Sequence, residues 1–301
     1  MSSDSKDIVP GAAETGAAAD RMAGVDPRPG VPKPDPILRA SGIRRSFGGL
    51  TAVNVEHLEV QRGTITALIG PNGAGKSTLF NLLTGFDRVD AGEWAFENRQ
   101  LNGLSGHKVA RQGMVRTFQL TKALTRMTVL DNMLLAAPRQ KGEGFFGAFA
   151  RPVWRAQEAA NRKRAMELLE RFKLDAKKDD MAGSLSGGQR KLLEMARSLM
   201  VDPSMVMLDE PMAGVNPALV QSLLEHITAL RDEGTTVLFV EHDMDVIMGI
   251  SDWIVVLAQG EVIAEGRPDD IRSNDEVIDA YLGKQHDEPN GGTAAEAEGT
   301  T

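Results

Sequence analysis

The chain has 301 residues, 42% of them apolar and 25% charged, a composition typical of a globular protein with a substantial buried core. Its net charge of −8 argues against general electrostatic binding to nucleic acid, and the absence of cysteine excludes disulfides, thiolate metal sites and a catalytic thiol. No run reaches the roughly 18 apolar residues of a membrane span, and the N-terminus lacks the features of a secretory signal. We therefore expect a cytoplasmic protein.

Composition divides the chain into a folded centre and two tails. Residues 1–35 and 284–301 are rich in small and polar residues and poor in aromatic ones. Such segments bury too little surface to offset the entropy lost on ordering. We expect both tails to be disordered and the folded domain to span residues 36–283.

Short apolar runs alternate with helical patterns along this domain. Residues 64–69, 204–208 and 236–240 are typical of buried strands, and residues 253–264 of a hairpin. Strands that alternate with helices predict an α/β core with a parallel sheet. The stretch of about 120–200 is mostly helical in pattern, which predicts an inserted helical subdomain.

Two further helices have clear sequence signals at their starts. The first is expected over residues 76–84, directly after a glycine-rich segment. The second begins at Asn216 and Pro217, an N-cap residue followed by the residue favoured at the first helical position. Its apolar face is predicted to continue to a stop near Gly234.

Residues 70–77 (GPNGAGKS) match the phosphate-binding pattern G-x-x-x-x-G-K-[ST], between an expected strand and an expected helix. Glycines allow backbone N–H groups to surround phosphate oxygens, and the helix N-terminus adds partial positive charge. Lys76 can reach the β- and γ-phosphates, and the Ser77 hydroxyl can bind Mg²⁺. The segment predicts a nucleoside triphosphate site, without choosing among kinases, GTPases and ATPases.

The apolar strand over residues 204–208 ends in two carboxylates, Asp209 and Glu210. Beside a phosphate-binding loop, the first is placed near Mg²⁺ and the second can polarise an attacking water. No N-K-x-D guanine signature occurs in the chain. GTP is therefore disfavoured.

Residues 185–189 (LSGGQ) precede a helical pattern, and a Ser-Gly-Gly opening on a helix is a second potential anion site. Together with the phosphate-binding loop and the acidic strand end, this pentapeptide resembles the signature of ABC transporter nucleotide-binding subunits. The resemblance covers nearly all of residues 38–283. It implies a P-loop NTPase core of α/β class with a mixed sheet, an N-terminal antiparallel β-subdomain and an inserted α-helical subdomain.

The resemblance also assigns roles to individual residues, with ATP and Mg²⁺ as the cofactors. Phe47 would stack on adenine, Gln119 would contact Mg²⁺ or the attacking water, Glu210 would be the catalytic glutamate, and His242 would contact the γ-phosphate. The implied ATP-binding residues are Phe47, Gly70, Pro71, Asn72, Gly73, Ala74, Gly75, Lys76, Ser77, Thr78 and Gln119. The implied catalytic residues are Lys76, Glu210 and His242, and the implied Mg²⁺ ligands are Ser77, Gln119 and Asp209.

Such subunits pair head to tail, so that Ser186, Gly187, Gly188 and Gln189 of one chain would act in the ATP site of its partner. The resemblance therefore implies a second ATPase subunit, identical or paralogous. It also implies hydrophobic permease subunits, which would hold the chain at the inner face of the cell membrane, and a solute-binding protein.

A closer resemblance is to the branched-chain amino acid transport ATP-binding group. It is carried by residues 45–50 (RSFGGL), 116–119 (RTFQ), 213–217 (AGVNP), 241–244 (EHDM) and 280–283 (AYLG). It implies import of branched-chain or related amino acids. Urea-uptake and lipopolysaccharide-export ATPases share several of these features and are alternatives, and a soluble ABC ATPase outside transport is less favoured.

Residues 139–164 combine basic and aromatic side chains in an otherwise acidic protein. Such a segment can lie against lipid headgroups or a permease loop. The alternative is a part of the helical subdomain whose aromatic residues pack inward. The sequence leaves both interpretations open.

Overall fold

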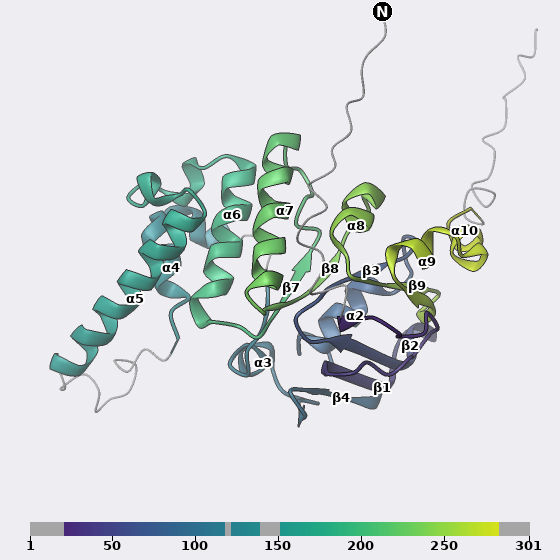
Figure 1. Ribbon diagram of the computed structural model, residues 1–301. Helices are drawn as coiled ribbons and strands as arrows, with labels where there is room; N and C mark the ends of the chain where they lie inside the picture. Colours follow the sequence, from purple (N-terminus) through teal and green to yellow (C-terminus); the bar gives the residue numbers. More distant parts are fainter. Residues whose placement is uncertain (1–20, 118–121, 139–150, 283–301) are drawn as a thin grey trace, which may run out of the picture.

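The computed structural model describes residues 21–117, 122–138 and 151–282 (Figure 1). The described strands form two sheets, one in the order β2-β1-β4-β5 and the other in the order β10-β9-β3-β8-β7-β6. Figure 1 shows the helices α4, α5 and α6 grouped together, away from the β1, β2 and β4 strands. The structure thus has the predicted α/β architecture with an antiparallel β-subdomain and a helical subdomain.

The first sheet is antiparallel. Two of its strands precede the phosphate-binding segment in the chain, and two follow it. Its strands are β1 (Pro36–Phe47), β2 (Leu50–Gln61), β4 (Ala91–Phe96) and β5 (Arg99–Gln100). Buried and exposed residues alternate over much of β1 and β2, as expected for a sheet with one face in the core. The resemblance to ABC subunits implied this subdomain, and the structure confirms it.

The second sheet is mixed, and it positions the predicted site. Its strands are β3 (Ile65–Ile69), β6 (Met114–Arg116), β7 (Met205–Asp209), β8 (Thr236–Val240), β9 (Trp253–Ala258) and β10 (Glu261–Gly266). All neighbours are parallel except β9 and β10, which form the predicted hairpin. The strands β3 and β8 are buried along their whole length, which explains their continuous apolar runs.

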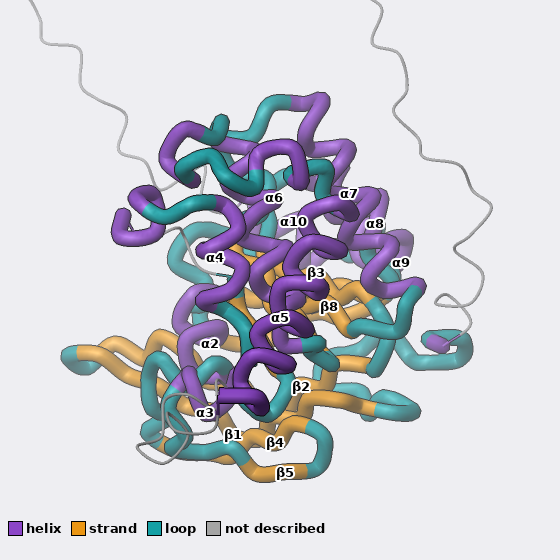
Figure 2. Tube along the Cα trace, turned by 90° about the vertical axis from the view of Figure 1, so that its left-hand side faces the viewer, coloured by secondary structure: helices purple, strands orange, loops and turns teal. Residues whose placement is uncertain are grey.

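The α-helices in the described ranges follow the predicted alternation with strands. They are α2 (Lys76–Leu83), α3 (Gly106–Ala110), α4 (Val129–Leu135), α5 (Arg151–Arg171), α6 (Gly187–Ser198), α7 (Pro217–Asp232), α8 (Met244–Ile250), α9 (Pro268–Arg272) and α10 (Asp275–Leu282). The Asn216 side chain accepts from Leu219 N at 3.0 Å, which confirms the predicted N-cap of α7. Figure 2 shows the helices α4–α8 gathered above and in front of the strands. None of the described helices is long and apolar enough to cross a membrane.

The mixed sheet separates two hydrophobic cores. Alternate side chains of β3 enter opposite cores: Ile65, Ala67 and Ile69 pack with α4–α8, and Leu68 packs with α2 and the antiparallel sheet. A continuous apolar layer therefore packs the helical subdomain against the sheet.

Residues 21–35 differ from their predicted disorder, because they pack on the folded domain. Met22 and Val31 are buried, and Arg267 Nη2 donates to Met22 O at 2.7 Å. Average composition did not predict this packing, because only a few widely spaced residues of the segment contact the folded domain. Residues 1–20, residues 283–301, Gln119 and the aromatic residues at 145–149 lie outside the described residues.

A buried ion pair fixes the N-terminal segment to the hairpin of the mixed sheet. Lys33 Nζ lies 2.9 Å from Glu265 Oε2, and both side chains are almost fully buried. Trp253 Nε1 also donates to Glu265 Oε2 at 2.9 Å, and Val31 N donates to Glu265 Oε1 at 2.9 Å. The Glu265 carboxylate therefore has several donors. Burial lowers the pKa of the Lys33 ammonium, with Glu265 opposing that effect.

Replacing Lys33 with Ala should destabilise the protein by about 3–5 kcal/mol, because the buried Glu265 carboxylate loses its counter-charge. Chemical denaturation measures the free energy of unfolding. Arg28→Ala, which removes an exposed pair with Asp26, is the matched control and should cost less than about 1 kcal/mol. Equal effects of the two substitutions would contradict the anchoring role of Lys33.

Candidate functional site

The loop from β3 to α2 carries the predicted phosphate-binding residues 70–78. Two of its glycines are required by close backbone contacts. A Cβ at Gly70 would lie 1.9 Å from Leu257 O, and one at Gly75 would lie 2.3 Å from Ala52 O. Gly75 also has a φ of 101°, a conformation that favours glycine. The backbones of β9 and β2 thus pack closely against the loop. The helix α2 begins directly after it, at Lys76.

Lys76 is buried within the loop that it is predicted to serve. Its Nζ donates to Gly70 O at 2.6 Å and to Pro71 O at 3.1 Å. The ammonium therefore lies among backbone carbonyls at the start of the loop. Ser77, next along the helix, is exposed. A phosphate bound here would compete with these carbonyls for the ammonium.

Asp209, at the end of β7, forms an ion pair with an arginine that the sequence analysis did not assign to the site. Arg116 Nη2 lies 2.5 Å from Asp209 Oδ2, and Arg116 Nη1 donates to Asn81 Oδ1 at 2.6 Å. Asn81 lies on α2. Arg116 therefore links the acidic strand end to the helix of the phosphate-binding loop, three residues before Gln119.

Glu210 and His242 meet at the carboxyl edge of the mixed sheet. Their side chains lie 2.9 Å apart, Glu210 Oε1 to His242 Nε2, and both are nearly half exposed. A carboxylate can only accept, so Nε2 is the donor when Glu210 is ionised. Glu210 has a φ of 47°, which is unusual for a residue with a side chain. The backbone thus turns sharply at the predicted catalytic residue.

Glu241, between β8 and His242, binds two backbone N–H groups at this edge. Its Oε1 accepts from Met212 N at 2.7 Å, and its Oε2 accepts from His242 N at 3.1 Å. Burial raises the pKa of the Glu241 carboxyl, and the two backbone donors oppose that rise. The residue holds the loop after Glu210 against His242. In the sequence, Glu241 stands out only as part of the motif over residues 241–244.

The signature residues 185–189 begin α6 in the helical subdomain. Ser186 is the N-cap: its side chain accepts from Gln189 N at 3.2 Å, while Gln189 Oε1 accepts from Ser186 N at 3.0 Å. Figures 1 and 2 place α6 apart from α2. Gly188 lies close to Leu219 of α7, where an added Cβ would meet the Leu219 side chain at 1.7 Å.

Phe47, predicted to stack on adenine, ends β1 and is 48% exposed. The Arg45 guanidinium lies over its ring, 4.6 Å from the centroid, and is held there by Asp87 and Asp90. The ring therefore has a cation on it and open surface around it. Gln119, the other predicted contact outside the loop, cannot be placed because it lies outside the described residues.

The donor set suits Mg²⁺, which prefers oxygen ligands and keeps several waters when it binds one or two protein groups together with phosphates. Ser77 lies in the helix that follows β3, and Asp209 ends β7 of the same sheet. No cluster of three or more His, Cys, Asp or Glu that could hold a metal without a nucleotide occurs in the described part of the chain. These residues therefore fit a metal that binds with a phosphate ligand.

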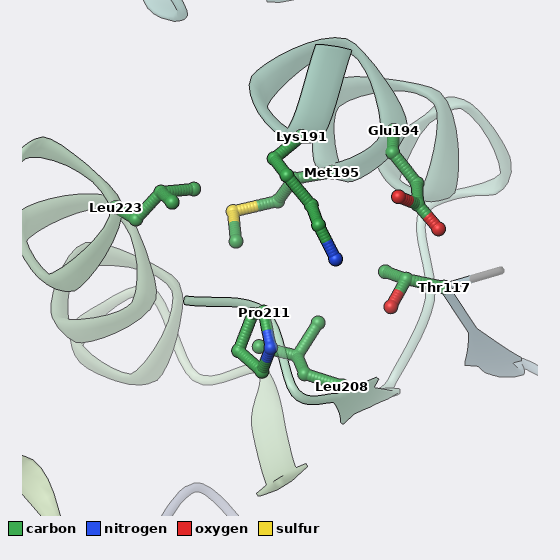
Figure 3. Close-up of a pocket in the computed structure, with 7 residues that line it drawn as sticks. All are labelled: Thr117, Lys191, Glu194, Met195, Leu208, Pro211 and Leu223. Atoms are coloured by element: carbon green, nitrogen blue, oxygen red, sulfur yellow. The ribbon is translucent and has the colours of Figure 1, made fainter. Parts of the chain in front are cut away.

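A small pocket lies where the helical subdomain meets the mixed sheet (Figure 3). It is lined by Thr117, Lys191, Glu194, Met195, Leu208, Pro211 and Leu223. Figure 3 shows Lys191 reaching down from α6 and the Glu194 carboxylate pointing toward Thr117. Lys191 Nζ donates to Glu210 O at 3.3 Å. The signature helix is therefore connected to the backbone of the predicted catalytic residue.

Glu194 is the unusual titratable group of this pocket. Burial raises the pKa of its carboxyl to about 7, although the positive charges of Lys191 and Arg197 oppose the rise. The unfolded chain would ionise this carboxyl near its ordinary value of 4.5. Glu194 therefore binds a proton in the folded state over a pH range in which the unfolded state has lost it.

Comparison with known proteins agrees with this geometry. A family model described as ABC transporter matches residues 53–213, and a second, described as branched-chain amino acid ATP-binding cassette transporter, matches residues 261–287. The phosphate-binding loop, the acidic end of β7 and the signature helix define an ABC-type P-loop ATPase. The chain belongs to the ABC transporter ATP-binding family, whose members bind nucleotide and are ATPases coupled to solute transport.

The individual relatives match this chain over nearly their whole length. The high-affinity branched-chain amino acid transport ATP-binding protein BraF of Pseudomonas aeruginosa is 45% identical, with 83% of this chain and 98% of that protein covered. The probable branched-chain amino acid transport ATP-binding protein LivG of Archaeoglobus fulgidus is 43% identical, covering 84% and 97%. A crystal structure of the ADP conformation of an ABC transporter cassette is 38% identical, covers 82% and 99%, and has a TM-score of 0.72.

Between pH 5 and pH 8 the protein should lose about 2 kcal/mol of unfolding free energy relative to the variant Glu194→Gln. The sign follows from the raised pKa: the folded state keeps the proton above 4.5, so the contribution of Glu194 falls as the pH rises towards 7. Denaturation curves at several pH values measure the difference.

The control for this series is Glu167→Gln on α5, whose exposed carboxylate lies 3.8 Å from Lys163. Its unfolding free energy should run parallel to that of the unaltered protein across the pH range. A pH dependence unchanged by Glu194→Gln would show that another group titrates in this window.

Proposed function

We propose that this chain is the ATP-hydrolysing subunit of a membrane transporter that imports branched-chain or related amino acids. The carrying observation is 43–45% identity over almost the full length of relatives named for branched-chain amino acid transport. The match of residues 261–287 to a model of the same description supports it from a separate part of the chain. The ATPase centre that such a subunit needs is the edge formed by β3, β7 and β8.

In the proposed reaction, water attacks the γ-phosphorus of ATP, the bond to the bridging oxygen breaks, and ADP and phosphate are released. The Glu210 carboxylate accepts the proton of the attacking water. The N–H of His242 Nε2, which donates to Glu210 at 2.9 Å, holds that carboxylate and can donate to a γ-phosphate oxygen. Lys76 would leave the carbonyls of Gly70 and Pro71 to stabilise the charge on the transferred group.

Mg²⁺ would be held by Ser77 and Asp209, with Gln119 as the third proposed ligand. When bound, it would neutralise charge on the phosphates. Asp209 is paired with Arg116, so the carboxylate would have to share or exchange that partner on binding the metal. Phe47 would stack on the adenine through the exposed part of its ring.

The site requires a second subunit in this proposal. Ser186 and Gln189 begin α6 in the helical subdomain, away from the α2 loop of their own chain (Figures 1 and 2). A head-to-tail pair would bring the signature of each chain to the phosphates bound by the other. Hydrophobic permease subunits would place the pair at the inner face of the cell membrane, and a solute-binding protein would deliver the substrate.

Glu210→Gln should lower the ATPase rate by at least about 100-fold, because the amide cannot accept the proton of water. ATP binding should persist, since the phosphate-binding loop is intact. Phosphate release measures the first quantity and calorimetry with Mg²⁺ and ATP the second. The surface control Glu233→Gln, which alters a pair with Arg171, should keep both. Near-normal turnover of Glu210→Gln would remove this residue from the mechanism.

Uptake by the native host tests the transported substrate. Replacing Lys76 with Ala in the chromosomal copy should abolish ATP-driven uptake of labelled leucine, isoleucine or valine, while urea uptake stays unchanged. The loss follows from the missing ammonium at the phosphates. Loss of urea uptake alone, or an exported lipid that accumulates inside the cell, would assign the subunit to one of the alternative transporters.

A further inference from the structure

The guanidinium of Arg116 lies between the two elements that carry the proposed Mg²⁺ ligands. In the register of the mixed sheet, Arg116 of β6 pairs with Met207 of β7, and Asp209 follows two residues later. Because alternate residues of a strand share a face, the side chains of Arg116 and Asp209 leave the sheet on the same side. Met207 packs in the core that contains the apolar residues of α2. The shared side is therefore the one that α2 covers.

The two ends of the guanidinium bind groups on different elements. Arg116 Nη2 lies 2.5 Å from Asp209 Oδ2, at the end of β7. Arg116 Nη1 donates to Asn81 Oδ1 at 2.6 Å and to Thr84 Oγ1 at 3.4 Å, in the last turn and at the C-cap of α2. A guanidinium presents its donors in a rigid planar fork, so it fixes the direction of its partners as well as their distance. The end of β7 is thus held against the end of α2.

Packing also holds the Arg116 side chain, which is only 12% exposed. Its guanidinium lies over the rings of Phe80 and Phe86, 5.7 Å and 6.0 Å from their centroids. Aromatic faces attract a cation and keep water from it. The position of the fork is therefore set by the rings as well as by the hydrogen bonds.

One face of α2 carries both the partner of Arg116 and a proposed metal ligand. Asn81 lies four residues after Ser77, and residues four apart share a face of a helix. Mg²⁺ binds through one or two protein groups together with phosphates, in a geometry close to octahedral. The relative position of Ser77 and Asp209 therefore matters for the metal, and the Arg116 fork connects the two elements that carry them.

We propose that Arg116 is a positioning residue of the ATP site, whose guanidinium holds the Asp209 carboxylate in the orientation that binds Mg²⁺ with nucleotide. The inference rests on the proposed function in taking Mg²⁺ and ATP as the ligands. A carboxylate has two oxygens, so Asp209 can bind the metal through one of them while Oδ2 keeps Arg116. The guanidinium also competes with the metal for the carboxylate charge. Its orienting effect is the larger one in this proposal, as for other donors that hold metal ligands in place.

The substitution Arg116→Met tests this role, because it keeps a long side chain beside the two aromatic rings and removes the fork. Calorimetry measures the ADP affinity of the full chain in Mg²⁺ and, separately, in EDTA. In Mg²⁺ the affinity should fall about 10-fold, as expected when a metal ligand loses its outer partner. In EDTA it should change less than about 2-fold, since the phosphate-binding loop is intact. Electron paramagnetic resonance of free Mn²⁺, titrated into the ADP complex, should show the same loss directly in the metal affinity.

The substitution Asn81→Ala is a second test, which leaves the charge of Arg116 in place. Loss of this partner should lower the affinity for ADP in Mg²⁺ about 3-fold and again spare binding in EDTA. Arg62→Met is the matched control. Arg62 also pairs with two partners, Asp35 and Glu97, but it precedes β3, whereas the phosphate-binding loop follows that strand. Both affinities should remain those of the unaltered chain.

The two conditions separate the possible results. An unchanged or higher affinity of Arg116→Met in Mg²⁺ would overturn the inference, because the guanidinium would then only compete with the metal. Equal losses in Mg²⁺ and in EDTA would also overturn it, since they would show a general defect of the fold. If Arg116→Met does not fold, Asn81→Ala decides by the same criteria.

The unaltered chain distinguishes this inference from the proposed function. If it binds ADP equally well in Mg²⁺ and in EDTA, the positioning role is wrong while the nucleotide site of the proposed function stands. If it binds no ADP in either condition, the proposed function fails and the positioning role fails with it.

Discussion

The parallel register between β7 and β8 is the constraint on which the rest of the site depends. It pairs Asp209 with Val240, and Glu210 N donates to Val240 O at 3.0 Å just beyond the paired residues. Glu210 and His242 are 32 positions apart in the chain, yet they leave neighbouring strands at the same edge and meet at 2.9 Å. A shift of one residue would turn each side chain to the other face of the sheet. Apart from Thr236 and Asp209 both strands are apolar, and only Asp209, at the edge, is not fully buried.

The same edge accounts for the unusual backbone at Glu210. A residue with a positive φ costs on the order of 1 kcal/mol or more and persists where its surroundings determine it. Here Val240 O fixes the Glu210 N–H, Lys191 Nζ binds the Glu210 carbonyl, and Glu241 holds the following loop through Met212 N. Lys191 belongs to α6. The backbone of the proposed catalytic residue is therefore sensitive to the position of the signature helix.

Local patterns were sufficient to predict the central strands and the start of α7. The strands over residues 64–69, 204–208 and 236–240 follow from continuous apolar runs, and Asn216 and Pro217 marked the start of α7 because capping depends on near neighbours. Glu210 and His242 were assigned through the family resemblance, and the structure brings them together.

Contacts between distant positions could not be predicted in this way. Arg116 and Asp209 are 93 positions apart, and Lys33 and Glu265 are 232 apart, so no periodicity links either pair. The average composition of residues 21–35 did not reveal the few residues, such as Met22 and Val31, that pack on the folded domain. Two of these contacts involve residues of the proposed ATP site: Arg116 pairs with Asp209, and Lys76 binds the carbonyls of its own loop. In the proposed function, ATP and Mg²⁺ would therefore compete with partners that the chain itself supplies, because the ammonium and the carboxylate already have charge-assisted hydrogen bonds.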